Sequence, residues 1–287
     1  MKRFFNTIVL SLAATAAVAQ NDSAAVEILR PVTSAYSIEV GSSHLTDTYL
    51  TPLNYDGWTA AMSYERLQAP RFNPAGAIMQ LRGRLSVDRD QNPARNATMW
   101  GLDLNVDWGV LWRLKSSRLP RGLALSGGFN TGIDLGALYL ARNGNNPVTA
   151  KAAWTVGISA MAVYNFRLGA LPLTLRYQPS LPLTGVFFSP DYGELYYEIY
   201  LGNRSGLVHC AWPGNYFRLD NLVTLDLRFK GATLRLGYHN EVYSGKVSNI
   251  VSGHTVHSFV VGLANEWISL SPRRKLSDDA KIISAIY

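Results

Sequence analysis

The sequence of 287 residues predicts an all-β protein, and more closely a transmembrane, antiparallel up-and-down β-barrel of ten to twelve strands. Two long segments that alternate apolar and polar residues carry this prediction, because strands in soluble sheets are usually only about 5–6 residues long. The third observation is that short turns and longer polar loops follow the predicted strands in alternation, as at the two ends of a membrane barrel.

The first alternating segment covers residues 98–114. Its apolar side chains stand at every second position from Trp100 to Trp112, and Asp103 and Asp107 fall between them. Successive side chains of a strand point to opposite faces, so one face is apolar and the other acidic. The two tryptophans are 12 positions apart, which corresponds to roughly 30 Å along the barrel axis at roughly 3.3 Å per residue and a tilt of about 40°. That distance suits two aromatic girdles around an apolar band about 25 Å tall.

Residues 154–166 repeat this pattern, with Trp154 and Phe166 again 12 positions apart on one face. We therefore expect aromatic side chains at both membrane interfaces and carboxylates inside the barrel. The predicted membrane girdle consists of Trp58, Trp100, Trp112, Trp154, Phe166 and Trp267.

Residues 1–19 have the features of a secretory signal peptide. Lys2 and Arg3 precede an apolar stretch at 8–16, and a small-x-small sequence at 17–19 offers a cleavage site. An N-terminal anchor helix is the alternative. Cleavage removes two positive charges and lowers the net charge from +7 to about +5, which is too small to indicate nucleic acid as a partner. No later stretch has the 18 or more consecutive apolar residues of a membrane-spanning helix, and the single cysteine, Cys210, excludes an internal disulfide.

The predicted organisation is a periplasmic lead at 20–33, an outer-membrane barrel at 34–270 and a polar C-terminal tail at 271–287. Residues 45–56 and 244–253 are polar and predict loops. The irregular segment 179–214 is either one long loop, which gives ten strands, or contains a further strand pair, which gives twelve; we favour twelve. Both counts are even, as required if both termini are periplasmic. The predicted strands cover residues 36–40, 58–65, 77–88, 98–114, 123–141, 154–166, 173–178, 223–229, 234–239 and 254–270.

The inward face is expected to carry nearly balanced charge, with six carboxylates against five arginines. Charges inside a barrel of this size must be paired or hydrated. We expect an ion-pair network that closes the lumen. A narrow polar channel or ligand cavity is the alternative, and balanced charge argues against a wide pore. The predicted lumen network comprises Glu39, Glu65, Arg82, Arg84, Asp103, Asp107, Arg176, Asp226, Arg228, Arg235, His239 and Glu241.

Only the sequence around His239 invites a catalytic hypothesis. Outer-membrane phospholipase A and lipid A deacylase barrels use a histidine and a serine two residues apart on one strand, so that the imidazole can take the hydroxyl proton. Here Glu241 stands at the serine position, and His239 is expected to face inward. The sequence therefore predicts no catalytic residue, with an acyl hydrolase using His239 as the alternative.

Two other pairs, His209 with Cys210 and His254 with His257, could be considered as metal ligands. They lack further ligands at metal-binding spacing and are expected on the surface. We expect no metal site and no cofactor.

The predicted signal peptide, the two girdle strands and the alternation of turns and loops resemble those of bacterial outer-membrane β-barrels over nearly all of the chain. Residues 190–198 are also similar to uncharacterised secreted families known only as domains of unknown function. The barrel resemblance implies export to the outer membrane, with membrane lipids, the barrel assembly machinery and a small polar solute as expected partners. It implies no substrate. The expected function is that of a non-catalytic small channel or a structural or binding surface; a soluble periplasmic barrel with its tryptophans inside, around an apolar ligand, is a further alternative.

Overall fold

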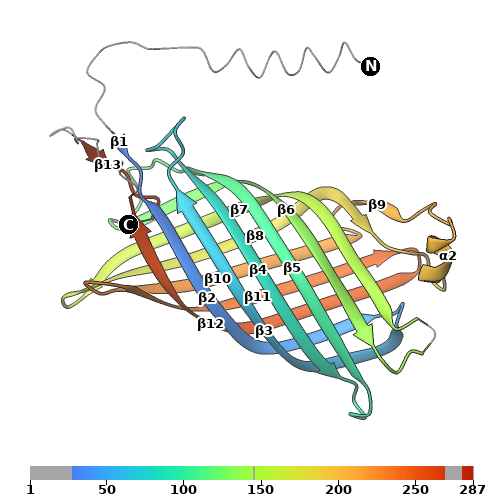
Figure 1. Ribbon diagram of the computed structural model, residues 1–287. Helices are drawn as coiled ribbons and strands as arrows, with labels where there is room; N and C mark the ends of the chain where they lie inside the picture. The colour runs from blue at the N-terminus through green and yellow to red at the C-terminus, as the bar shows by residue number, and fades with distance from the viewer. Residues whose placement is uncertain (1–27, 145, 269–279, 287) are drawn as a thin grey trace, which may run out of the picture.

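The computed structural model describes residues 28–144, 146–268 and 280–286. The predicted signal peptide, and most of the predicted lead and tail, lie outside these residues. Ten antiparallel strands form a closed barrel, because β12 pairs with β2 and β8 pairs with β10 (Figure 1). The strands are β2 (Val32–Asp47), β3 (Thr51–Gln68), β4 (Ala77–Gln91), β5 (Thr98–Arg113), β6 (Leu123–Leu140), β7 (Val148–Leu168), β8 (Leu171–Phe188), β10 (Tyr216–Arg228), β11 (Thr233–Val247) and β12 (Ile250–Trp267).

The segment between β8 and β10 adds no strand pair to the ring. β8 continues through Pro179 and Pro182, and the segment then forms the short helix α2 (Tyr196–Tyr200) and the strand β9 (Val208–Ala211). β9 pairs with β8 at 185–188, beyond the part of β8 that pairs with β10. The barrel therefore has ten strands, and the preference for twelve is wrong. No helix among the described residues is long and apolar enough to span a membrane.

The strands are longer than the alternation of apolar residues predicts. β2 ends and β3 begins within the expected loop at 45–56. β11 and β12 are separated only by Ser248 and Asn249, with φ of 51° and 63°, as in the tight type I′ turn of a hairpin. The expected loops at 45–56 and 244–253 are therefore mostly wrong. Predicting strands from alternating apolar residues ends them too early, because the backbone hydrogen bonds between strands continue beyond the apolar band.

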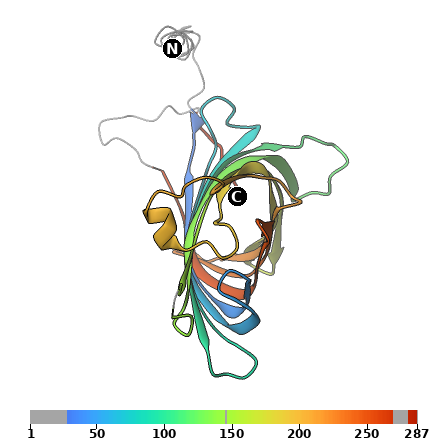
Figure 2. The same ribbon diagram turned by 90° about the vertical axis from the view of Figure 1, so that its right-hand side faces the viewer.

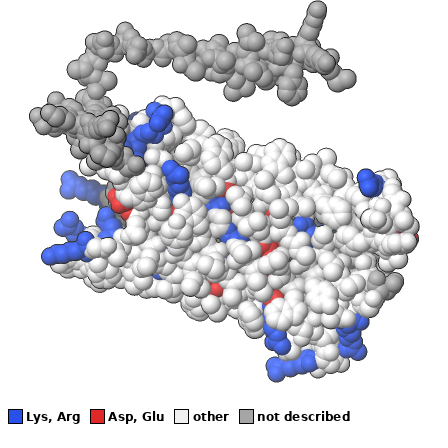
Figure 3. Space-filling model, viewed as in Figure 1, with Lys and Arg blue, Asp and Glu red and all other residues white. Residues whose placement is uncertain are grey.

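The outward face of the barrel is apolar along its middle. On β5, Trp100, Trp108 and Trp112 are 41%, 48% and 43% exposed, whereas Asn105, which lies between them in sequence, is 8% exposed. Figure 3 shows most of the visible Lys and Arg toward the two ends of the barrel, with smaller patches of Lys, Arg, Asp and Glu between them. The soluble-barrel alternative requires tryptophans that point into the barrel, whereas the tryptophans of β5 are exposed on its outer face.

The end of the chain returns to one mouth of the barrel. β1 (Ile28–Leu29) pairs in parallel with β13 (Lys281–Ile282), at the end opposite to α2 (Figure 1). Residues 280–286, which include β13 and are here called the C-terminal plug, extend into this mouth. Although the tail is predicted to be polar, these last described residues bring apolar side chains to the barrel.

Apolar packing and hydrogen bonds fix the C-terminal plug. Ala285 and Ile286 are 3% and 7% exposed. Arg113 donates from Nη2 to the carbonyl oxygens of residues 284 and 285, at 2.7 and 2.8 Å, and Asn165 donates to that of residue 286 at 3.2 Å. The side chains that surround the plug come from β3, β4, β5 and β7, and are Leu67, Ile78, Leu111, Met161 and Val163.

Candidate functional site in the barrel interior

Buried ion pairs fill the lumen next to the C-terminal plug. The carboxylate of Glu65, on β3, accepts hydrogen bonds from Arg176 Nη1 at 2.8 Å and from Arg235 Nη1 at 2.6 Å. Arg235 also donates to Asp226, from Nε at 2.7 Å and from Nη2 at 2.8 Å. These four side chains are at most 9% exposed. Removing charges from water costs several kcal/mol per ion, so each of these groups needs the partners that it has.

A second group of charges surrounds His239, whose side chain is 1% exposed. The imidazole lies between two carboxylates, with Nδ1 3.0 Å from Glu39 and Nε2 2.7 Å from Asp220. Arg84 donates to Glu39 at 3.0 Å, and Arg82 donates to Asp220 at 3.0 Å. Each carboxylate thus contacts both the imidazole and an arginine.

These ion pairs join opposite walls of the barrel. In the ring of ten strands, β4 is five places from β10, and β3 is five places from β8. Arg82 on β4 contacts Asp220 on β10, and Arg176 on β8 contacts Glu65 on β3. The lumen is therefore bridged directly by side chains at this level.

Arg218, on β10, is the centre of a third group closer to α2. It pairs with Asp134 and with Glu241, the latter at 3.1 Å. Asp134 also accepts hydrogen bonds from Asn105 at 2.7 Å and from the Tyr216 hydroxyl at 3.3 Å. This group forms the polar floor of a cavity of about 70 Å³.

The segment that contains α2 crosses the barrel at the cavity end (Figure 2). The Tyr49 hydroxyl donates to the carbonyl of Glu194 at 2.7 Å, and the Tyr196 hydroxyl accepts from the backbone N–H of Ala150 at 2.7 Å. Burial raises the pKa of Tyr196 to about 12, so this hydroxyl stays neutral at physiological pH. Two tyrosines thus fasten the segment to the barrel rim.

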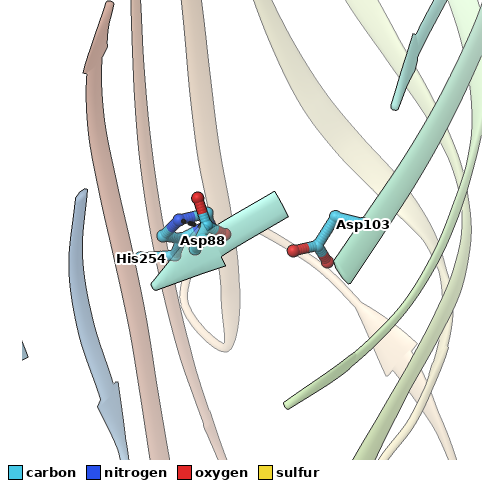
Figure 4. A group of neighbouring side chains, drawn as sticks. All are labelled: Asp88, Asp103 and His254. Carbon is cyan, nitrogen blue, oxygen red and sulfur yellow. Dashed lines mark ion pairs between the residues drawn. The ribbon is translucent and has the colours of Figure 1, made fainter. Parts of the chain in front are cut away.

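Three ionisable side chains lie together beside the cavity: Asp88 on β4, Asp103 on β5 and His254 on β12 (Figure 4). One possible ligand atom from each lies within 4.8 Å of the others. Asp88 is 0% exposed and His254 is 6% exposed, and His254 Nε2 lies 3.4 Å from the Asp88 carboxylate. His254 was expected on the surface, and that expectation is wrong, because β12 begins at Ile250 and turns this side chain inward.

Of the twelve residues predicted to form the lumen network, nine take part in the three ion-pair groups described above. The other three lie elsewhere: Asp103 and Asp107 point inward beside the groups, and Arg228 lies at the β10–β11 end of the barrel. The nine are Glu39, Glu65, Arg82, Arg84, Arg176, Asp226, Arg235, His239 and Glu241.

The sequence prediction does not include Asp134, Arg218 and Asp220. Arg218 and Asp220 precede the predicted strand at 223–229 and belong to the first half of β10. A signal is present, because Phe217 and Leu219 extend the alternation backward along this strand. Asp134 lies on β6, where glycines interrupt the alternation.

A closed antiparallel barrel with an apolar outer face and a paired, charged interior defines the class of transmembrane β-barrel proteins. Within this class, the chain belongs to the DUF3316 family, described as "Protein of unknown function (DUF3316)", whose pattern matches residues 5–274. Both resemblances noted in the sequence are thereby confirmed.

Among solved structures, the outer membrane protease OmpT from Escherichia coli has a TM-score of 0.50 and 8% identity, over 83% of this chain and 97% of that chain. The translocator domain of the autotransporter NalP from Neisseria meningitidis has a TM-score of 0.39 and 12% identity, over 92% of this chain and 96% of that chain. The transport unit of the autotransporter AIDA-I from Escherichia coli has a TM-score of 0.36 and 8% identity, over 92% and 97%. No curated protein is significantly similar to the chain. At 8% identity, the likeness to OmpT concerns the fold alone.

Proposed function

We propose that this protein is a non-catalytic outer-membrane barrel with a plugged lumen, which presents a binding surface at its α2 end. The observation that carries the proposal is the direct bridging of opposite walls. Arg82 with Asp220, and Arg176 with Glu65, cross the lumen from wall to wall, and the C-terminal plug covers one mouth. A conducting channel needs a continuous water-filled path through the lumen, and these contacts interrupt that path.

The exposed aromatic side chains support the membrane location. Trp58, Trp100, Trp112 and Trp154 are 41–51% exposed on the outer wall, and Trp267 is 47% exposed. Indole rings favour the interface between headgroups and acyl chains. The proposed girdle thus contacts outer-membrane lipids, after export by the predicted signal peptide and insertion by the barrel assembly machinery.

The surroundings of His239 favour a structural role over catalysis. Acyl chains reach a barrel from its lipid side, whereas this imidazole is held inside between Glu39 and Asp220. The buried hydroxyl of Ser258 points at Glu39, at 3.4 Å, rather than serving as a nucleophile for His239. An acyl hydrolase built on His239 is therefore the weaker alternative.

The cavity at the α2 end supports the binding part of the proposal. It combines the ionisable side chains of Asp103, Lys151 and His254 with the rings of Phe187 and Tyr243. Small-ligand sites commonly combine an apolar lining with a few placed polar groups. A small polar solute or ion is the ligand class that fits about 70 Å³.

Planar-bilayer recording of the refolded full-length protein tests whether the lumen is closed. We expect no discrete conductance, with insertion verified separately by heat-modifiable electrophoretic mobility. The double variant E65A/R176A removes one bridge as a pair and leaves Arg235 with Asp226. It should also stay silent, because Arg82 still contacts Asp220 across the lumen and the C-terminal plug still covers one mouth. Discrete single-channel steps from the unsubstituted protein would refute the proposal.

A further inference from the structure

The two levels of the lumen differ in how their acids are neutralised. Farther from α2, Glu39, Glu65, Asp220 and Asp226 each pair with an arginine. Near α2, four aspartates lie inside the barrel, and among the described residues none of them forms an ion pair with Arg or Lys. These aspartates are Asp47, Asp88, Asp90 and Asp103, of which the first three are 0% exposed.

Several ligand atoms of this acidic group make no hydrogen bond with a described residue. These include Oδ2 of Asp103 and Nε2 of His254, both buried, the latter in a side chain that is more than nine-tenths buried and directed at Asp88. A buried polar atom that lacks a partner is costly by roughly 1–3 kcal/mol, and more if charged. Such a group needs a cation, a water molecule or a proton.

The backbone leaves room for the two carboxylates. Asp88 lies opposite Gly101 in the β4–β5 register, and Asp103 lies opposite Gly136 in the β5–β6 register. A Cβ atom at Gly101 would lie 2.8 Å from Asp88 Oδ2, and one at Gly136 would collide with Asp103 Oδ1. Glycine at these positions lets both carboxylates lie against the barrel wall, directed toward His254.

We propose that Asp88, Asp103 and His254 bind a divalent transition-metal ion, with Zn²⁺ as the probe. Two carboxylates and an imidazole are ligands that zinc accepts at about 2.0–2.2 Å, and three protein ligands leave a position for water. Calcium and magnesium prefer oxygen ligands alone. The inference rests on the proposed function in one respect, because the metal ion would be the occupant of the α2-end cavity.

Access and charge agree with this assignment. Asp103 and His254 both line the cavity, so an ion and its water ligands can reach them. Two cationic side chains line the same cavity, Arg218 and Lys151. Arg218 is already paired with Asp134 and Glu241, and the Lys151 ammonium lies over the Tyr243 ring at 5.6 Å. The four aspartates outnumber Lys151, and Arg218 is balanced by two other acids. A divalent cation therefore adds positive charge that this level of the lumen lacks.

Zinc binding to the refolded full-length protein, stripped with EDTA, measures the site by competition with a chromogenic chelator. We expect one Zn²⁺ per chain, and an affinity that falls by about 10–100-fold or more in H254A and in D103N, since even weaker perturbations around metal ligands have effects of this size. H257A is the matched control. His257 lies three residues along the same strand, faces outward and contacts the Tyr238 hydroxyl.

A second measurement keeps the test independent of folding differences. Co²⁺ should give visible absorption bands with the unsubstituted protein and H257A, and these bands should be lost in H254A. D103N, which keeps the side-chain shape, replaces H254A if that variant lacks heat-modifiable mobility. Absence of stoichiometric Zn²⁺ binding, or equal loss in H254A and H257A, would overturn the metal site. Neither result bears on the bilayer recording, and conductance in the bilayer leaves the Zn²⁺ stoichiometry untouched.

Discussion

Replacing Glu65 by Gln removes the carboxylate that two buried guanidinium groups share. Arg235 keeps its two hydrogen bonds to Asp226. Among the described residues, the hydrogen bond left to Arg176 is the one that its Nε donates to the Thr224 hydroxyl, at 3.3 Å. One ion pair at 4 Å contributes about 4 kcal/mol at an effective dielectric constant of about 20. Breaking a buried pair from one side costs about 3–5 kcal/mol. We therefore expect E65Q to lower the free energy of unfolding by about 3–5 kcal/mol.

Urea unfolding in lipid vesicles, followed by fluorescence of the seven tryptophans, measures this change. D56N is the control, because the Asp56 side chain is 71% exposed in its pair with His44, and exposed pairs contribute about 0–1 kcal/mol. The double variant E65Q/R176M removes both charges of one pair and should recover part of the loss. If E65Q destabilises the barrel no more than D56N does, the buried network does not hold the lumen as argued.

Three further predictions follow from the surface and from the two ends of the barrel. Cys210, the single cysteine and exposed on β9, should react with a membrane-impermeant maleimide on intact cells; labelling only after permeabilisation would place α2 on the periplasmic side. L104R, on the outer face in the middle of β5 where Leu104 is 41% exposed, should destabilise the membrane-inserted barrel by about 2–4 kcal/mol in the same urea assay, and an effect below about 1 kcal/mol would argue against lipid contact there. Truncation after residue 279 removes the buried side chains of Ala285 and Ile286 and should lower the urea midpoint of unfolding. Planar bilayers should still show no conductance, because the ion pairs still bridge the lumen. Conductance after truncation would show that the C-terminal plug alone closes the lumen.

The sequence predicts the barrel well because one face of each strand contacts a uniform environment. On β5, every second side chain from Trp100 to Trp112 is apolar and faces outward. The strand ends are less predictable, because beyond the apolar band no face needs to be apolar. The turn at Ser248 and Asn249 lies in such a region, within ten residues whose polarity resembles that of a loop.

For the barrel interior, the sequence predicts which side chains point inward but not which of them contact one another. Alternation indicates that Glu65 points inward, but its partners Arg176 and Arg235 are 111 and 170 residues away in sequence. Which inward residues meet depends on the tilt of the strands and on the shear of the closed ring, and these quantities are set by all ten strands together. The group around Asp88 and His254 is hidden for the same reason, since its members come from separate strands.

One physical requirement accounts for both the closed part of the lumen and the acidic level near α2. Far from either mouth, a buried charge needs a partner from the protein itself, as Arg84 supplies for Glu39. Beside a cavity that reaches the barrel end, a carboxylate such as Asp103 can be neutralised from outside. A chain that needed only a closed lumen could have paired these aspartates with arginines, as Arg218 pairs with Asp134 and Glu241 at the same level. The excess of aspartate at the cavity is therefore the feature that points from structure toward binding, and the Zn²⁺ titration with H254A and H257A separates a bound cation from carboxylates that are merely protonated.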